Sequence, residues 1–223
     1  REAREEMSQL RDRLVSLEES LAKLEAALAE RNNDGPYFNG PKLSLVDAAR
    51  PRVCFIPTAS GDDIGYTLQF YQAYGGYGCE PQVLNLFNRE VEDIRSFLLG
   101  MDMVYVGGGS TANLLSVWRL HGVDVALAEA WQKGVVLAGL SAGANCWFQS
   151  STTDSFLIGN AEVLSDGLGF LAGSFCPHYT AEPERRPNYL KLVAGGQLPG
   201  GYACEDGAAV HFIGPRFEAA VSV

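Results

Sequence analysis

Apolar side chains recur at alternating intervals of three and four positions through the first part of this chain. The series consists of Met7, Leu10, Leu14, Leu17, Leu21, Leu24 and Leu28. These intervals form a heptad repeat with a narrow apolar seam and polar flanks, a pattern typical of self-associating helices. We therefore expect residues 1–31 to form a coiled-coil helix through which copies of the chain associate. A single amphipathic helix packed on the rest of the chain is the alternative.

The pattern changes at residues 32–42, the predicted linker. The sequence NNDGPYFNGP at 32–41 has two glycines and two prolines, a composition typical of a linker. Beyond it, short apolar runs alternate with segments of helical periodicity. Strands are expected at 52–58, 82–87, 102–106 and 135–138, and helices at 64–74, 91–99, 111–120 and 125–133. This order predicts that residues 43–223 form an α/β domain with a mostly parallel sheet covered by helices on both faces. Such sheets bind ligands beyond the carboxyl ends of their strands.

Composition narrows the range of partners. The 223 residues are 47% apolar and 20% charged, as in one globular domain with an appendage. The net charge of −10 argues against a nucleic-acid partner, because phosphate binding requires a basic surface. With no apolar run long enough to span a bilayer and no signal-like start, we expect a cytoplasmic protein without a membrane partner. The five cysteines are widely spaced and form no CxxC pair, so neither a disulfide framework nor a metal site is predicted.

The stretch GVVLAGLSAGANCWF, residues 134–148, contains the motif G-x-S-x-G between a predicted strand and a predicted helix. A serine on such a sharp turn, here Ser141, projects from the sheet, and small neighbours allow the strand and helix to approach each other. The N–H of Ala142 would then point toward a developing oxyanion. We interpret Ser141 as a nucleophile; the alternative is a glycine-lined turn that only packs the helix on the strand.

A nucleophilic serine requires a base, and the chain has three histidines. His121 follows a predicted helix and His211 lies inside an alternating strand, whereas His178 lies in a loop after an apolar strand, where sheet proteins present functional groups. We therefore expect His178 to be the base. The acids between Ser141 and His178 that could orient the imidazole are Asp154, Glu162 and Asp166. Their spacing does not distinguish among them.

A second glycine-rich loop, GGGST at 107–111, follows the predicted strand at 102–106 and opens a helix. Its glycines allow backbone amides to approach a ligand closely. The loop also fits a loose form of the dinucleotide-binding fingerprint, but the acidic residues about twenty positions further on fall in a helical stretch instead of at a strand end. We therefore expect Gly108 or Gly109 to supply a second oxyanion donor beside Ala142.

Together, the GGGST block, GLSAGAN, the TTD that follows and PHYT resemble the peptidase E (aspartyl dipeptidase) family of serine peptidases over residues 51–217. The resemblance implies a fold similar to class I glutamine amidotransferases and a triad of Ser141, His178 and Asp154. It implies an oxyanion amide from Gly108 or Gly109, and neither a metal nor another cofactor. It also implies an arginine downstream of the histidine that binds a substrate carboxylate. Arg185 and Arg186 are the candidates, with a solvated helix end as the alternative.

Two departures from the family pattern stand beside this resemblance. From the resemblance we expect the predicted heptad helix and linker to take the place of the first strand of the family and its glycine-rich loop, and the chain to stop early at FEAAVSV. We predict a serine peptidase acting on short peptides, with dipeptides that carry an acidic N-terminal residue as candidates. The first alternative is a non-catalytic scaffold or binding module oligomerised by the coiled coil. The second is an esterase with the α/β-hydrolase fold. Ser141 and His178 are only 37 positions apart, which leaves little room for the strands and helices that this fold normally inserts between them.

Overall fold

The computed structural model describes residues 45–46, 48–157, 159 and 161–222. The predicted coiled coil at 1–31 and the linker at 32–42 lie outside the described residues, so both stay predictions. The chain divides into a unit of residues 1–39 and a unit of residues 40–223. The second of these units contains every element described below. No helix within the described residues has both the length and the apolar character required to cross a membrane.

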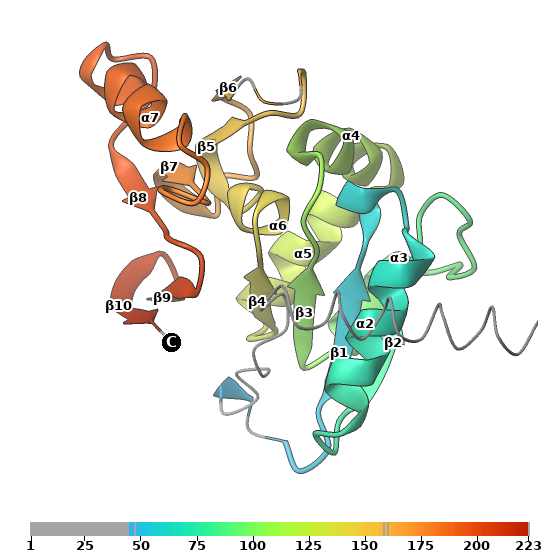
Figure 1. Ribbon diagram of the computed structural model, residues 1–223. Helices are drawn as coiled ribbons and strands as arrows, with labels where there is room; N and C mark the ends of the chain where they lie inside the picture. Colours follow the sequence, from blue (N-terminus) through green and yellow to red (C-terminus); the bar gives the residue numbers. More distant parts are fainter. Residues whose placement is uncertain (1–44, 47, 158, 160, 223) are drawn as a thin grey trace, which may run out of the picture. The chain divides into compact units, whose positions relative to one another are not determined.

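Four parallel strands form the first sheet of this unit (Figure 1). Its strands are, in spatial order, β2 (Glu80–Val83), β1 (Arg52–Ile56), β3 (Met103–Val106) and β4 (Val136–Gly139). Four consecutive residues of β1, 53–56, are fully buried, as expected for a strand covered on both faces. The predicted parallel α/β arrangement is therefore confirmed for this part of the chain.

Seven helical segments accompany the strands. They are η2 (Thr58–Ser60), α2 (Ile64–Gly75), α3 (Ile94–Leu99), α4 (Thr111–His121), α5 (Val123–Gln132), α6 (Ala142–Asn145) and α7 (Arg185–Ala194) in the described residues. Side-chain oxygens cap three of them: Asp63 accepts from Tyr66 N–H, Asp93 from Ser96 N–H and Ser110 from Asn113 N–H. These contacts satisfy amide donors that have no partner inside the first turn of a helix.

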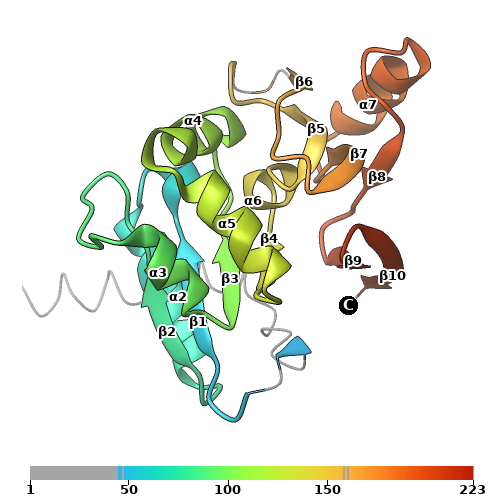
Figure 2. The same cartoon turned by 180° about the vertical axis from the view of Figure 1, so that it is seen from behind.

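Helices cover both faces of the first sheet, as Figures 1 and 2 show from opposite sides. Phe55 of β1 stacks on Phe70 of α2 with ring centroids 4.9 Å apart. Its neighbours Cys54 and Ile56 belong to the core that includes Trp118 of α4. Because side chains alternate between the faces of a strand, α2 lies on one face and α4, with α5 and α3, on the other.

The strand predicted at 82–87 begins earlier and ends at Val83. Beyond Leu84, whose N–H still donates to the Phe55 carbonyl, the backbone leaves β1. The amides of Leu86 and Phe87 donate instead to the Asp62 carboxylate, at 2.6 and 2.8 Å. A side chain therefore takes over the hydrogen bonds that would have extended the strand.

The later strands form a second sheet instead of extending the first. Its spatial order is β6 (Glu162–Leu164), β5 (Phe148–Thr153), β7 (Leu171–Cys176) and β8 (Gly201–Ala203), with only the β5–β6 pair antiparallel. A parallel return beside β4 would require a crossover of about a dozen residues. Only residues 140–147 separate β4 from β5, so the mostly parallel strands that were predicted are divided between two sheets.

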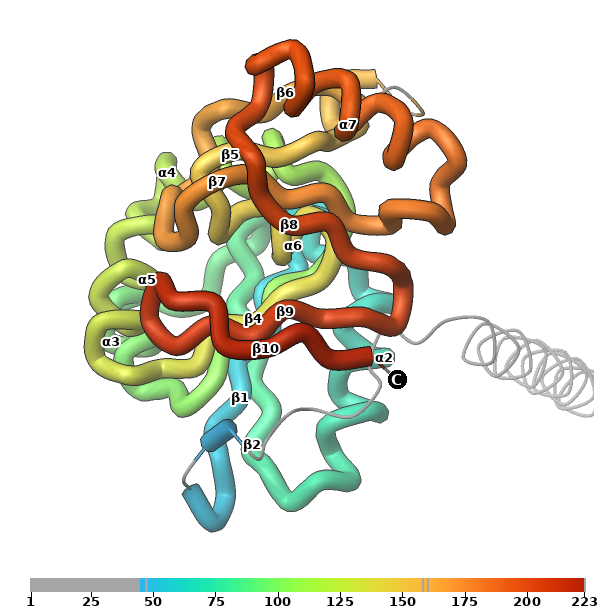
Figure 3. Tube along the Cα trace, turned by 90° about the vertical axis from the view of Figure 1, so that its left-hand side faces the viewer, coloured from blue at the N-terminus to red at the C-terminus, as the bar shows by residue number. Residues whose placement is uncertain are grey.

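The chain ends in an antiparallel hairpin of β9 (Ala208–Ile213) and β10 (Arg216–Ser222), which Figure 3 shows following β8. One hydrophobic core joins the two larger sheets. Trp118 of α4 lies against Trp147, just before β5, with ring centroids 6.1 Å apart, and within the second sheet Phe148 of β5 stacks on Phe175 of β7 at 4.8 Å. The short helix α6 contacts strands of both sheets. This position places Ser141, immediately before α6, at their junction.

We expect Trp118→Ala to lower the free energy of unfolding by about 3–5 kcal/mol. Trp118 is fully buried and its indole N–H donates to Thr58 Oγ1 at 3.2 Å, so truncation leaves both a cavity and a hydroxyl without its donor. Leu120→Ala is the matched control, because Leu120 is on the same helix and 80% exposed; its effect should stay within about 0.5 kcal/mol. Urea denaturation followed by circular dichroism measures both, and equal effects would contradict the assignment of this core.

Candidate active site

Ser141 occupies a strained position between β4 and α6. Its φ of 51° and ψ of −115° lie in a region that residues with a side chain rarely adopt. Among the described residues, only Asp62, Ser141 and His178 have a positive φ without being glycine. Two of these three are the predicted nucleophile and base. Strain of this kind persists where the surrounding structure imposes it, which happens most often at functional sites.

Two glycines on either side of Ser141 allow this turn to form. A Cβ atom on Gly139 would lie 2.1 Å from the Gly143 carbonyl oxygen, and one on Gly143 would lie 2.2 Å from the Val106 carbonyl oxygen. Both approaches exclude any side chain. The G-x-S-x-G motif thus has a direct cause: the helix backbone lies against the strand that carries the serine and against β3.

The GGGST loop lies beside this turn. A Cβ atom on Gly108 would be 3.3 Å from Ser141 Cβ, so the loop borders the serine as predicted. Gly109 has a φ of 134°, and a Cβ there would lie 2.2 Å from the Ala59 carbonyl oxygen. That oxygen also accepts the Ser110 N–H at 2.8 Å. The structure therefore brings together Gly108, Ser141 and Ala142, with Gly109 held next to them.

His178 lies just after β7 and adopts a φ of 53°. Its Nδ1 is 2.7 Å from Oδ1 of Asp206, which follows the neighbouring parallel strand β8. The carboxyl ends of β7 and β8 lie at the same edge of the second sheet, and this brings the two residues together. A neutral imidazole that donates Nδ1–H to this carboxylate carries its lone pair on Nε2, the form that can accept a proton from a serine.

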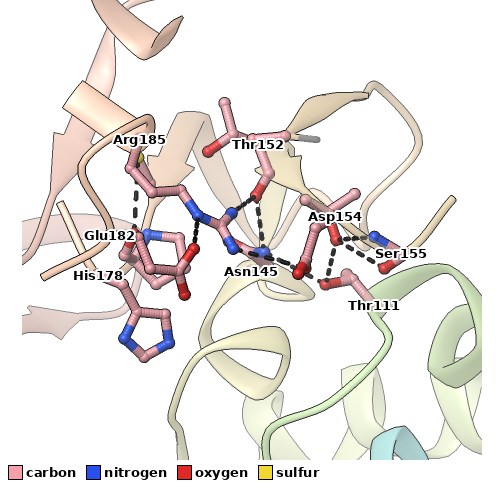
Figure 4. A network of polar contacts seen from close by, with 12 residues as sticks. Thr111, Asn145, Thr152, Asp154, Ser155, His178, Glu182 and Arg185 are labelled. Atoms are coloured by element: carbon pink, nitrogen blue, oxygen red, sulfur yellow. Dashed lines mark hydrogen bonds and ion pairs between the residues drawn. The ribbon is translucent and has the colours of Figure 1, made fainter. Parts of the chain in front are cut away.

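The imidazole therefore has a different carboxylate from the one that was predicted. Asp154 forms an ion pair with Arg185, with Oδ1 and Nη2 3.5 Å apart, and the His178 ring points away from this pair (Figure 4). Asp166, the second candidate, pairs with Arg119 at 2.8 Å. Asp206 was missed because only acids between Ser141 and His178 were considered. Its signal in the sequence was its place after a short apolar segment, like that of His178.

Arg185, predicted to bind a substrate carboxylate, is occupied inside the protein. Its side chain is 5% exposed, and Nε donates to Glu182 at 2.6 Å while Nη1 donates to the Thr152 carbonyl at 3.3 Å. With Asp154 as a further partner, two carboxylates face one guanidinium. Arg186 is exposed, and its guanidinium lies 5.8 Å from the centroid of the Tyr179 ring. Of the two arginines, Arg186 alone presents its charge at the surface.

A buried polar cluster behind the serine turn joins α6, α4 and the end of β5 (Figure 4). Asn145 Nδ2 donates to Thr111 Oγ1 at 3.2 Å and to the Thr152 carbonyl at 3.1 Å. Thr153 Oγ1 lies within hydrogen-bond distance of the hydroxyls of Thr111 and Ser155. Hydrogen bonds between buried polar groups fix the relative positions of the elements that they join, although Asn145 Oδ1 and Thr152 Oγ1 have no partner within the described residues. Sequence analysis did not identify this cluster, since its members are far apart along the chain.

The nearby Cys146 does not compete with Ser141 as a nucleophile. It is fully buried, and burial raises the pKa of its thiol well above the usual value. The reactive form of a cysteine is the thiolate, so this residue stays protonated and inert. No group of three or more potential metal-ligating side chains occurs within the described ranges.

Ser141 and His178 are not hydrogen-bonded to each other in the described part of the chain. Helix α6, which begins directly after Ser141, is in contact with strand β7, which ends just before His178. Hydrogen bonds between catalytic groups are often long without substrate and tighten in its presence. An α/β fold with a serine on a strained strand-to-helix turn is the architecture of a serine hydrolase.

Comparisons with known proteins agree with this class. A model of peptidase family S51 matches residues 39–220. The chain is 50% identical over 173 residues to "Uncharacterized peptidase YgaJ" of Bacillus subtilis (strain 168), covering 78% of this chain and 74% of that protein. It is 30% identical over 131 residues to "Peptidase E" of Streptomyces coelicolor, covering 59% and 52% of the two chains.

Solved structures show the same fold at low sequence identity. The "Putative Peptidase E Protein" of Listeria monocytogenes EGD-e superposes with a TM-score of 0.62 at 21% identity, covering 81% of this chain and 91% of that one. A peptidase from an acI-B1 actinobacterium gives a TM-score of 0.55 at 20% identity, with 84% and 81% covered. The chain described here belongs to peptidase family S51. It is a serine hydrolase that acts as a peptidase.

We expect Gly143→Ala to destabilise the protein by about 1–3 kcal/mol and to slow the reaction of Ser141 with a fluorophosphonate probe. The added methyl group would meet the Val106 carbonyl at 2.2 Å and push α6 away from β3. Gly75→Ala is the control, since a Cβ there meets no atom within 4 Å. Urea denaturation and labelling rates measure both variants. A Gly143→Ala protein as stable and reactive as the wild type would rule out this close approach.

Proposed function

We propose that this peptidase cleaves short peptides through a triad of Ser141, His178 and Asp206. The observation that carries the proposal is the 2.7 Å contact between His178 Nδ1 and Asp206 Oδ1, in a protein whose Ser141 lies on a strained turn. The carboxylate holds the imidazole in one tautomer and stabilises its protonated form. It replaces Asp154, which is paired with Arg185, in the catalytic assignment.

The first half of the reaction acylates the enzyme. His178 Nε2 takes the proton of the Ser141 hydroxyl as Oγ forms a bond to the carbonyl carbon of the scissile peptide. The electron pair of the carbonyl moves to its oxygen, which accepts hydrogen bonds from Ala142 N–H and an amide of the glycine loop. The tetrahedral intermediate then breaks its C–N bond, and His178 gives the proton to the leaving amine.

The second half returns the enzyme to its starting state. His178 takes a proton from a water molecule as the water oxygen attacks the ester carbonyl of the acyl-enzyme. The bond to Ser141 Oγ breaks, the serine regains a proton from His178, and the peptide's new carboxylic acid leaves. These steps use only side chains and backbone amides of this chain.

Substrate preference is the part of the proposal that rests most on relatives. The similarity to "Peptidase E" and the resemblance described above support short peptides, including dipeptides with an acidic N-terminal residue. Arg186 supports a preference for an acidic residue, because its positive charge is exposed and it follows His178 by eight positions. Arg185 does not, because Glu182 and Asp154 already neutralise it. A panel of dipeptides that differ only in their N-terminal residue measures this preference directly.

We expect Ser141→Ala to abolish both dipeptide hydrolysis and covalent labelling by a fluorophosphonate probe. The substitution removes the oxygen that forms the covalent bond and leaves the fold in place, which circular dichroism verifies. Mass spectrometry of the labelled wild type should place the adduct on Ser141. Wild-type protein that is well folded but remains unlabelled would favour a non-catalytic scaffold instead.

Asp206→Asn should lower kcat/KM by about 10²-fold or more, because an amide at this position no longer favours the required tautomer or stabilises the imidazolium. Asp154→Asn provides the comparison, since it removes the same charge from the carboxylate that was predicted from the sequence. Its effect should be much smaller. Steady-state kinetics on one dipeptide decides between them: a larger loss for Asp154→Asn would return the triad to the predicted acid.

A further inference from the structure

The ring of Tyr66, on helix α2, is seated against the first glycine of the GGGST loop. A Cβ atom on Gly107 would lie 2.8 Å from Cε1 of this ring and 3.1 Å from the ring of Phe55. The two rings meet edge to face with centroids 5.0 Å apart. Glycine at position 107 therefore leaves the space that the phenol fills, and the Phe55 ring, itself buried, fixes the direction in which Tyr66 points.

The hydroxyl of Tyr66 makes a specific contact at the end of this ring. Its oxygen accepts the N–H of Gly108 at 3.2 Å. Gly108 is also the loop residue whose added Cβ would come within 3.3 Å of Ser141 Cβ. A tyrosine 42 positions earlier in the chain is thus bonded to the backbone that borders the nucleophile. Sequence analysis gave no indication of this residue.

The hydrogen bond between Gly108 and Tyr66 distinguishes Gly108 from Gly109, the two alternatives for the oxyanion donor. Between Gly107 and Ser110, three of the four amides have acceptors within the protein: Gly107 N–H donates to the Ile56 carbonyl at 3.2 Å, Gly108 N–H to Tyr66, and Ser110 N–H to the Ala59 carbonyl. Within the described residues, the N–H of Gly109 donates to no acceptor. The Gly109 backbone is itself held in place, because its φ of 134° and its close approach to Ala59 exclude a side chain.

From these contacts we infer that Tyr66 is a positioning residue of the oxyanion hole. By accepting Gly108 N–H, it holds the peptide between Gly107 and Gly108, while the bond from Ser110 N–H to Ala59 holds the peptide between Gly109 and Ser110. The peptide between these two carries Gly109 N–H, which together with Ala142 N–H donates to the oxyanion that forms when Ser141 attacks. The inference rests on the proposed function, because it assigns a role within the same reaction. In this role Tyr66 acts through the backbone of the glycine loop, with which its hydroxyl makes the hydrogen bond.

A residue with this role acts on the transition state and not on binding of the ground state. Donors of an oxyanion hole stabilise negative charge that exists only after the nucleophile has attacked. Freeing the loop therefore lowers kcat and leaves KM unchanged. It also slows phosphonylation, in which Ser141 Oγ forms a bond to phosphorus, fluoride leaves, His178 takes the serine proton and charge develops on the phosphoryl oxygen.

Tyr66→Phe tests the inference, since it removes the accepting oxygen and keeps the ring that packs on Phe55. We expect the second-order rate constant for fluorophosphonate labelling to fall about tenfold or more, a part of the effect of losing a donor outright. On a dipeptide substrate, kcat should fall by a similar factor with KM unchanged. Tyr71→Phe is the matched control: Tyr71 is on the same helix, is 41% exposed and packs on Phe70, so both measurements should equal those of the wild type.

The outcomes separate this inference from the proposed function. Labelling of Tyr66→Phe at the wild-type rate, with Ser141 still the modified residue, would overturn the positioning role and leave the triad intact. A rise in KM with kcat unchanged would also overturn it, because it would place the phenol in substrate binding. If the wild type neither hydrolysed the dipeptide nor reacted with the fluorophosphonate, the proposed function itself would be wrong. Rates are divided by the folded fraction from urea denaturation, so a less stable variant still gives a decisive ratio.

Discussion

The close approach of three backbone segments around Gly139 and Gly143 is the constraint on which the site depends. Any side chain at either position would collide with a carbonyl oxygen about 2 Å away. Because these residues have no Cβ, α6 can start directly after β4 while lying against β3. The same contact forces Ser141 into a conformation with positive φ, which costs about 1–3 kcal/mol and must be offset by packing elsewhere. The buried cluster around Asn145 and the shared hydrophobic core supply that packing, so the reactive geometry is a consequence of how tightly the junction is built.

The features that could be predicted from the sequence are those whose cause is local. An apolar run predicts the strand at 103–106, and helical spacing after a capping residue predicts the helix at 111–121. The Ser141 turn is equally local, since the glycines that permit it are two positions away on either side. In each case the residues that create the structure are close neighbours of the residues that show it. The glycine loop at 107–110 is local in its own conformation, but it lies beside Ser141 because β3 pairs with β4.

The features that could not be predicted depend on which strands become neighbours. Asp206 reaches His178 because β8 lies beside β7. The short apolar segment before Asp206 indicates a strand, but it does not indicate which strand is its neighbour. A search restricted to acids between Ser141 and His178 led to Asp154, whose actual partner, Arg185, comes from a helix that follows the histidine. The division into two sheets was missed in the same way, because it follows from the short connection between β4 and β5. Tyr66 and Gly108, 42 positions apart, are a further example.

The proposed triad depends both on a local turn and on strand pairing, because its members are divided between the two sheets. Ser141 is carried by the end of β4 in the first sheet, whereas His178 and Asp206 follow β7 and β8 in the second. The local turn fixes the direction of the hydroxyl, and the strand order fixes the imidazole, but neither sets the distance between them. That distance depends on the hydrophobic core that the two sheets share, where Trp118 of α4 meets Trp147 just before β5. Because interiors of this density transmit small displacements, the packing of these rings is as much a part of the catalytic geometry as the triad itself.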